Sequence, residues 1–121
     1  MNQPPPSVSD LTRQLIEFRD ARDWKQFHSL KDLILSLNLE ASELLELSQW
    51  KSERDFEAEA HEAPMQQRLR EECADVFLYL LLVAERAGIN IQEAAAEKII
   101  ANGKKYPVEK SRGTATKYNK L

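Results

Sequence analysis

The chain has 121 residues, of which 42% are apolar, and it contains only three glycines and five prolines. These values predict one compact helical domain and argue against both two packed domains and a disordered chain. A net charge of −3 argues against a generic nucleic-acid binder, so no stable nucleic-acid complex is expected. The single cysteine, Cys73, and the lack of a basic and apolar leader lead us to expect a cytoplasmic protein.

The charges are distributed unevenly along the chain. Eleven acidic residues face four basic ones over residues 40–75, whereas seven basic residues face one acidic residue over residues 98–121. This distribution is compatible with solvated helix faces beside a flexible tail, and also with a chain that binds a metal ion and a polyanion together. The charge counts alone favour the solvated faces.

The chain begins with a proline-rich segment, and residues 1–8 are expected to form an extended arm. Ser9 is the predicted cap of a first helix that ends near Asp23, because serine side chains accept hydrogen bonds from the free backbone N–H groups of a first turn. The apolar residues of this helix recur at spacings that place them on one face: Leu11, Leu15 and Phe18.

A second helix is predicted after a short aromatic connection over residues 24–28. Ser29, followed three positions later by Asp32, is a start signal, and the helix is expected to run to about Trp50. Its aliphatic residues form a wide apolar stripe, which more than one neighbour must cover. Residues 51–64 are charged and lack apolar periodicity, which predicts a surface connection with room for a turn of helix.

A third helix is predicted over residues 65–87, which follow Pro64 and precede Gly88. It contains an unbroken apolar run, residues 76–84, which is too short to span a bilayer because spanning takes about twenty residues. We therefore expect no membrane insertion. The run is instead expected to be buried on all sides, in a bundle core together with a subunit interface.

A fourth helix is predicted over residues 91–104, and regular structure is expected to end at Tyr106 and Pro107. No alternating pattern predicts a strand. The expected architecture is an all-α, four-helix-type bundle, with a helical domain over residues 9–105 and a basic tail over residues 106–121.

Two acid-x-x-acid pairs lie on separate predicted helices, Glu40 with Glu43 and Glu72 with Asp75. Residues three apart on a helix are neighbours, so each pair points two carboxylates in the same direction. Each pair also borders an apolar stretch, where an uncompensated carboxylate is unfavourable. Two exposed acidic turns would explain the pattern, but its context favours a site for a hard cation, Mg²⁺ or Mn²⁺.

The rival metal chemistry of di-iron and di-manganese bundles needs Glu-x-x-His on paired helices. Both histidines, His28 and His61, lie in connections, so such a site is not expected. Glu46 extends the acidic cluster and is a further ligand, a general base or an outward-facing side chain.

Aromatic residues flank the acidic pairs. Trp50 lies seven residues after Glu43, and Tyr79 lies four residues after Asp75, so both are expected beside the proposed metal. Each aromatic residue alone is best explained by core packing. Together with the carboxylates and the basic tail, however, the aromatic side chains suit a nucleotide, whose base stacks and whose phosphates need a cation.

Four ordered blocks resemble the MazG-type all-α nucleoside triphosphate pyrophosphatases, and most closely their dCTP pyrophosphatase branch. The resemblance covers nearly the whole chain and is far more specific than either acidic pair. The blocks are Arg22-Asp23-Trp24-x-x-Phe27-His28, Glu40-x-x-Glu43-Leu44-x-Glu46-Leu47-x-Gln49-Trp50-Lys51, Glu71-Glu72-x-x-Asp75-Val76-x-x-Tyr79-Leu80, and Lys98-x-x-x-Asn102-x-x-x-Tyr106-Pro107-Val108 with Ser111-Arg112-Gly113 and Lys117-Tyr118.

The resemblance implies a Mg²⁺-dependent enzyme that cleaves a nucleoside triphosphate between its α and β phosphates, releasing the monophosphate and pyrophosphate. It implies a homodimer or homotetramer as well. By position, the metal ligands are Glu40, Glu43, Glu72 and Asp75, and Glu43 or Glu46 orients or deprotonates the attacking water.

The same resemblance implies a nucleotide pocket lined by Trp24, His28, Trp50 and Tyr79. Lys98, Asn102 and Tyr106 would hold the phosphates or the base, sometimes from a neighbouring subunit. One position departs from the pattern, because Leu15 stands where close relatives carry a histidine.

We therefore expect an enzyme that removes dCTP or a modified dCTP from the nucleotide pool. Two alternatives remain open: a pyrophosphatase with broad substrate range, and a non-catalytic helical oligomer that binds nucleotide or a partner protein through the same face.

Overall fold

A computed structural model describes residues 2–121, and this part of the chain contains helices and turns but no strand. The all-α prediction is confirmed. The chain divides into two compact units, Met1–Gly88 and Ile89–Leu121. Over residues 2–121, no helix combines the length and the apolar character that crossing a membrane requires.

The first helix, α1, spans Val8–Ala21, and its cap is Ser7. The prediction of Ser9 as the cap was wrong. Ser7 is the serine that stands three residues before Asp10, and the two form a capping box: Asp10 N–H donates to Ser7 Oγ (3.0 Å), and Ser7 N–H donates to the Asp10 carboxylate (3.1 Å). The box satisfies two backbone N–H groups that the helix itself cannot.

The second helix, α2, spans Leu30–Glu46, and Ser29 caps it as predicted by accepting a hydrogen bond from Asp32 N–H (3.1 Å). Its end near Trp50 was predicted wrongly. After Glu46 the backbone N–H groups bond three residues back instead of four, which tightens the chain into turns. Trp50 then adopts a φ of 64°, a left-handed conformation that cannot continue the helix.

The connection after α2 contains a short helix, α3, over Glu53–Glu59. Ser52 caps it by accepting a hydrogen bond from Asp55 N–H (3.1 Å). A 2.6 Å ion pair between Lys51 and Glu59 links the two ends of this segment. The predicted surface connection is confirmed, and its helical part is longer than a single turn.

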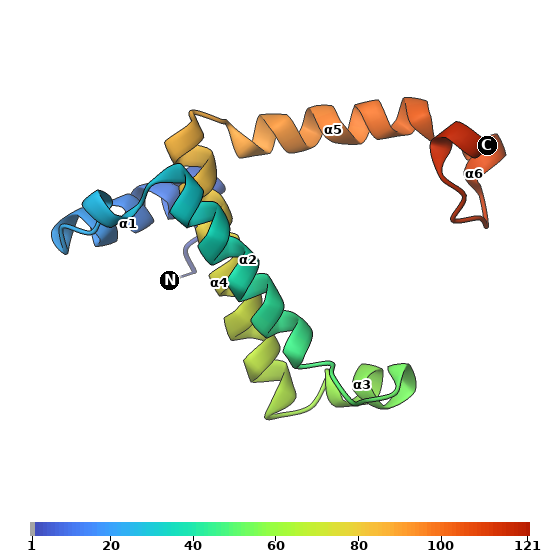
Figure 1. The fold of residues 1–121 in the computed structure, drawn as a ribbon, viewed down its shortest axis with the longest axis horizontal. Helices are drawn as coiled ribbons and strands as arrows, with labels where there is room; N and C mark the ends of the chain where they lie inside the picture. Colours follow the sequence, from blue (N-terminus) through green and yellow to red (C-terminus); the bar gives the residue numbers. More distant parts are fainter. Residues whose placement is uncertain (1) are drawn as a thin grey trace. The chain divides into compact units, whose positions relative to one another are not determined.

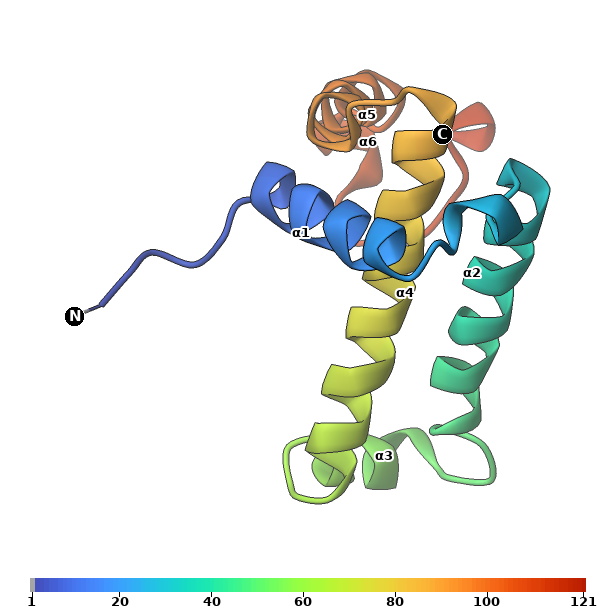
Figure 2. The same ribbon diagram turned by 90° about the vertical axis from the view of Figure 1, so that its left-hand side faces the viewer.

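The third long helix, α4, spans Met65–Ala87, as predicted from its flanking residues. Gly88 ends it with a φ of 70°, which glycine adopts without the penalty that a Cβ atom brings. Within unit Met1–Gly88, α2 and α4 run antiparallel and side by side, and α1 packs on α4 (Figures 1 and 2).

The core of this unit lies mainly on α4, where Leu81, Leu82 and Ala84 are buried together with Met65, and on α2, where Leu33 is buried. The apolar run 76–84 is therefore covered at its C-terminal end. In this chain alone, Phe77 remains 37% exposed, because α1 and α2 cover only part of the surface of α4.

The second unit begins with α5, which spans Ile91–Lys105 and is capped by Asn90. Regular structure does not end at Tyr106, contrary to the prediction. A short helix, α6, follows over Val108–Ser111, and a 3₁₀ turn, η2, over Tyr118–Lys120. The tail returns to the end of α5, where the Tyr118 ring lies 6.1 Å from the Tyr106 ring and 4.9 Å from Lys105 Nζ.

Leu81→Ala is expected to lower the free energy of unfolding by about 2–5 kcal/mol, because it leaves a cavity in the core. Ile99→Ala is the control: truncation of an aliphatic side chain that is 72% exposed is expected to lower it by less than about 1 kcal/mol. Urea unfolding followed by far-ultraviolet circular dichroism measures both values. Equal losses in the two variants would contradict the position of the core at Leu81.

Candidate functional site

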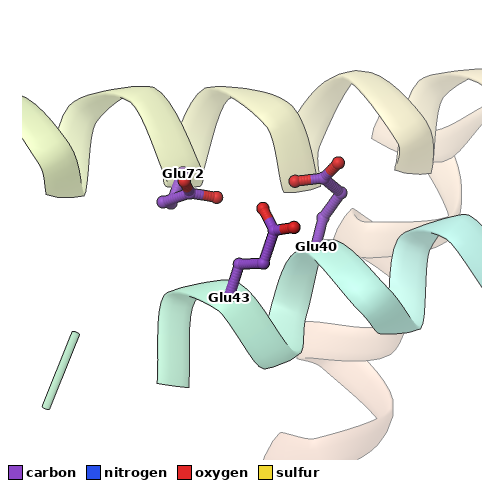
Figure 3. A group of neighbouring side chains, drawn as sticks. All are labelled: Glu40, Glu43 and Glu72. Atoms are coloured by element: carbon purple, nitrogen blue, oxygen red, sulfur yellow. The ribbon is translucent and has the colours of Figure 1, made fainter. Parts of the chain in front are cut away.

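Three carboxylates from two helices meet in the first unit. Glu40 and Glu43 lie one turn apart on α2, and the antiparallel partner α4 brings Glu72 opposite them. One carboxylate oxygen from each residue lies within 4.8 Å of the others. Figure 3 shows the carboxylates pointing toward one another in the space between the two helices. We call these three residues the acidic cluster.

The acidic cluster is partly desolvated. Glu40 Oε2 and Glu72 Oε2 are both buried and have no hydrogen-bond partner among residues 2–121. Desolvation is the largest cause that raises the pKa of Glu40, followed by the charge of Glu43. The pKa of Glu72 is raised in the same way, by desolvation first and then by Glu43. A divalent cation with oxygen ligands would compensate all of these effects, so the cluster can hold a metal ion.

Two other acids proposed for the metal site lie outside the acidic cluster. Asp75 is close enough for its charge to raise the pKa of both Glu40 and Glu72, but its oxygens are not within the 4.8 Å group. Glu46 is the exposed last residue of α2 and does not belong to the group either.

A pocket of about 160 Å³ lies next to Asp75, which forms part of its wall. It also contains three of the four aromatic or imidazole side chains implied by the resemblance: Trp24, His28 and Tyr79. His28 Nδ1 is buried and has no hydrogen-bond partner among residues 2–121. The rest of the wall is mostly apolar and comes from Leu15, Phe18, Leu78 and Leu82, together with Arg19.

The turn after α1 shapes the entrance to this pocket. Asp23 adopts a φ of 55°, which reverses the chain so that Trp24 N–H donates to the Arg19 carbonyl (3.1 Å). The Trp24 ring then meets Phe18 edge to face, with centroids 5.7 Å apart. The Arg22 guanidinium stacks on the Phe18 ring at 3.6 Å and holds this arrangement from the solvent side. A 3₁₀ turn, η1 (Lys25–Phe27), leads from Trp24 to His28.

The structure does not bring every proposed residue to this pocket. Trp50 is 99% exposed at the left-handed turn after α2 and forms no part of the wall. Lys98 and Asn102 lie on α5, and Tyr106 is its C-terminal cap, so all three belong to unit Ile89–Leu121.

Arg19, a buried residue of α1 that lines the pocket and is only 5% exposed, was not among the residues predicted from the sequence. The hydrogen bond that it donates to the Asp20 carboxylate is the largest cause that raises the pKa of its guanidinium, so the side chain is charged. Its position four residues after Leu15, on the helix face that Leu11 and Leu15 share, was the available signal.

Comparisons with known proteins agree with the all-α fold. Residues 35–121 match the family model described as MazG-like. The chain belongs to the MazG-like family, which confirms the resemblance noted from the four sequence blocks.

Named relatives cover almost the whole chain. The dCTP pyrophosphatase 1 of Rattus norvegicus is 40% identical over 118 residues, which are 98% of this chain and 69% of that protein. The human protein of the same name is 35% identical over 118 residues, with the same two coverages of 98% and 69%. The crystal structure of a pyrophosphatase from Archaeoglobus fulgidus superposes with a TM-score of 0.77 at 38% identity, covering 88% of this chain and 98% of that one.

The raised pKa values of Glu40 and Glu72 predict how metal-free protein responds to pH. Because the folded state holds protons that the unfolded chain releases near pH 4.5, the free energy of unfolding should fall as the pH rises from there through the folded-state pKa values. Glu40→Gln removes one such group, so the fall should be smaller.

Urea unfolding in the presence of a chelator, repeated between about pH 4.5 and 7.5, measures this effect. Glu57→Gln, at an exposed glutamate of α3, is the control and should follow the wild type. A fall in Glu40→Gln as large as in the wild type would contradict the prediction.

Proposed function

We propose that this protein hydrolyses a nucleoside triphosphate, dCTP or a modified dCTP, to the monophosphate and pyrophosphate. The proposal is supported by relatives named dCTP pyrophosphatase 1 and by the similar structure of a pyrophosphatase. The observation that carries it is the position of Asp75, which lines the aromatic pocket and also acts by its charge on the acidic cluster. A nucleobase bound in the pocket would therefore have a potential metal site beside it.

We propose that Mg²⁺, or Mn²⁺ in its place, binds to Glu40, Glu43 and Glu72, with Asp75 as a further ligand. The buried, unpartnered oxygens of Glu40 and Glu72 support this assignment, because buried carboxylate oxygens need a cation or a hydrogen-bond donor. A bound divalent cation supplies charge neutralisation on the phosphates and lowers the pKa of a bound water.

Glu43 is the proposed general base that deprotonates the attacking water. It is the exposed member of the acidic cluster, so it can accept a proton from water at its solvent side. Glu46, the alternative named from the sequence, lies outside the cluster. Glu40 and Glu72 are less accessible, so their role is to hold the cation.

The pocket is the proposed base-binding site. An apolar cavity of about 150 Å³ holds one benzene ring, so a pocket of about 160 Å³ suits the single ring of a pyrimidine. Trp24 and Tyr79 offer aromatic faces for that ring, and His28 Nδ1 offers a hydrogen bond that no residue from 2 to 121 satisfies.

Lys98, Asn102 and Tyr106 are proposed to contact the phosphates or the base, as the family resemblance implies. We also propose that the protein is a homodimer or homotetramer. Aliphatic side chains of α2 that are half exposed or more support self-association, because exposed apolar surface of this extent is typical of interfaces. They are Ile34, Leu35, Leu39 and Leu45.

The metal assignment predicts stabilisation by Mg²⁺. At a concentration one hundred times its dissociation constant, Mg²⁺ should raise the free energy of unfolding by about 2.7 kcal/mol, because it binds the folded state alone. Thermal unfolding over a Mg²⁺ titration measures this rise. Glu40→Gln should lose most of it, whereas Glu57→Gln should keep it, and the same Mg²⁺ response in both variants would exclude the acidic cluster as the site.

The catalytic assignment predicts that dCTP and Mg²⁺ give dCMP and pyrophosphate in equal amounts. Glu43→Gln should lower kcat by roughly 100-fold or more, because it removes the base and one cluster carboxylate. Product chromatography and a pyrophosphate assay measure both results, with Glu57→Gln as the control. Release of orthophosphate, or an unchanged kcat in Glu43→Gln, would overturn the mechanism, and tight binding of dCTP without turnover would indicate a binding protein instead.

A further inference from the structure

The pocket contains a buried arginine to which the proposed mechanism gives no role. Arg19 is 5% exposed and shares the pocket wall with Leu15, one helical turn before it. A buried cation is unfavourable unless it is paired. Its retention among apolar side chains therefore calls for an explanation in terms of what it contacts.

Two carboxylates hold the Arg19 guanidinium in place. Nε donates to Asp20 Oδ1 at 2.9 Å, and Nη1 donates to Glu85 Oε2 at 3.3 Å. Because Asp20 is the next residue of α1 and Glu85 lies on α4, the guanidinium is tied to both helices. This double attachment compensates its charge and restricts its orientation.

The two ion pairs do not use all of the donors. A guanidinium has five N–H groups, and the bonds to Asp20 and Glu85 use two of them. Nη2 has no acceptor among residues 2–121. A group oriented by two carboxylates, with donors left over at a ligand pocket, is well suited to bind acceptor atoms of that ligand.

The pattern of acceptors differs among pyrimidines. Cytosine has two adjacent acceptors, the exocyclic O2 and the unprotonated ring N3, which can match one N–H group of Nη1 and one of Nη2. In uracil and thymine, N3 carries a hydrogen atom, so a guanidinium placed at this edge meets one acceptor and one donor. Unmatched donors in a desolvated pocket are unfavourable, which makes such a contact selective.

We propose that Arg19 is a specificity-determining residue that donates to O2 and N3 of cytosine and thereby selects it against uracil and thymine. This proposal rests on the proposed function, because it takes the pocket to be the base-binding site. Leu15 cannot form a polar contact with the nucleobase. Under this proposal, Arg19 supplies such a contact from one helical turn further along α1.

The test compares binding of dCMP and dUMP by isothermal titration calorimetry in the wild type and in Arg19→Met, whose side chain is long but cannot donate. The wild type should bind dCMP more tightly. The ratio of dissociation constants Kd(dUMP)/Kd(dCMP) should fall by roughly 5- to 150-fold in Arg19→Met, which is the range for loss of one bidentate base contact. The ratio is insensitive to partial unfolding, because the same preparation binds both ligands.

Glu57→Gln is the control. It changes an exposed glutamate of α3 that is not part of the pocket wall, so the ratio Kd(dUMP)/Kd(dCMP) should change by less than about threefold, a small fraction of the bidentate range. If Arg19→Met does not fold, Arg19→Lys replaces it. Lysine keeps the charge without the planar pair of donors, so the ratio should still fall.

An unchanged ratio in Arg19→Met, or an equal weakening of both ligands, would overturn the proposal and indicate a structural or phosphate-binding role. A wild type that does not distinguish dCMP from dUMP would overturn it as well. Failure of the proposed function has a different result: dCMP binding without release of pyrophosphate from dCTP. If the wild type binds neither monophosphate, both proposals are wrong.

Discussion

The contact between α2 and α4 is the interaction on which the rest of the first unit depends. Burial of Leu33 on α2 and of Leu81 and Leu82 on α4 stabilises the pair. The same antiparallel arrangement brings Glu72 opposite Glu40 and Glu43. The acidic cluster therefore needs residues from both helices. Apolar residues elsewhere on α2 and α4 drive the packing that brings these carboxylates together.

The acidic cluster and the pocket differ in charge and in polarity. The acidic cluster concentrates negative charge, and desolvation there raises the pKa of Glu40 and Glu72. The pocket has a mostly apolar wall with one cation, whose charge is compensated by Asp20 and Glu85. A ligand with an anionic part and an uncharged ring would match both regions once a cation is bound at the acidic cluster.

Local signals in the sequence were sufficient for most helix boundaries. Ser29 with Asp32 predicted the start of α2, and Gly88 predicted the end of α4, because caps depend on neighbours in the chain. The end of α2 and the fold of the tail depend on a left-handed turn at Trp50 and on a distant ring, Tyr118, which no helical pattern reports. Arg19 was missed for a related reason: an arginine in a surface helix is ordinarily solvated, and only the positions of α4 and the Trp24 turn show that it is covered.

The attachment of Arg19 to Glu85 has a consequence for motion. Glu85 lies in the last turn of α4, three residues before the chain turns at Gly88, whereas Glu72 lies nearer the other end of the same helix. Glu72 of the acidic cluster and the pocket residues Asp75, Leu78, Tyr79 and Leu82 are therefore carried by one continuous helix, to which Arg19 of α1 is tied through Glu85. Sliding or tilting of α4 against α1 and α2 would therefore displace its contributions to the pocket and to the acidic cluster together, and would strain the Arg19–Glu85 ion pair.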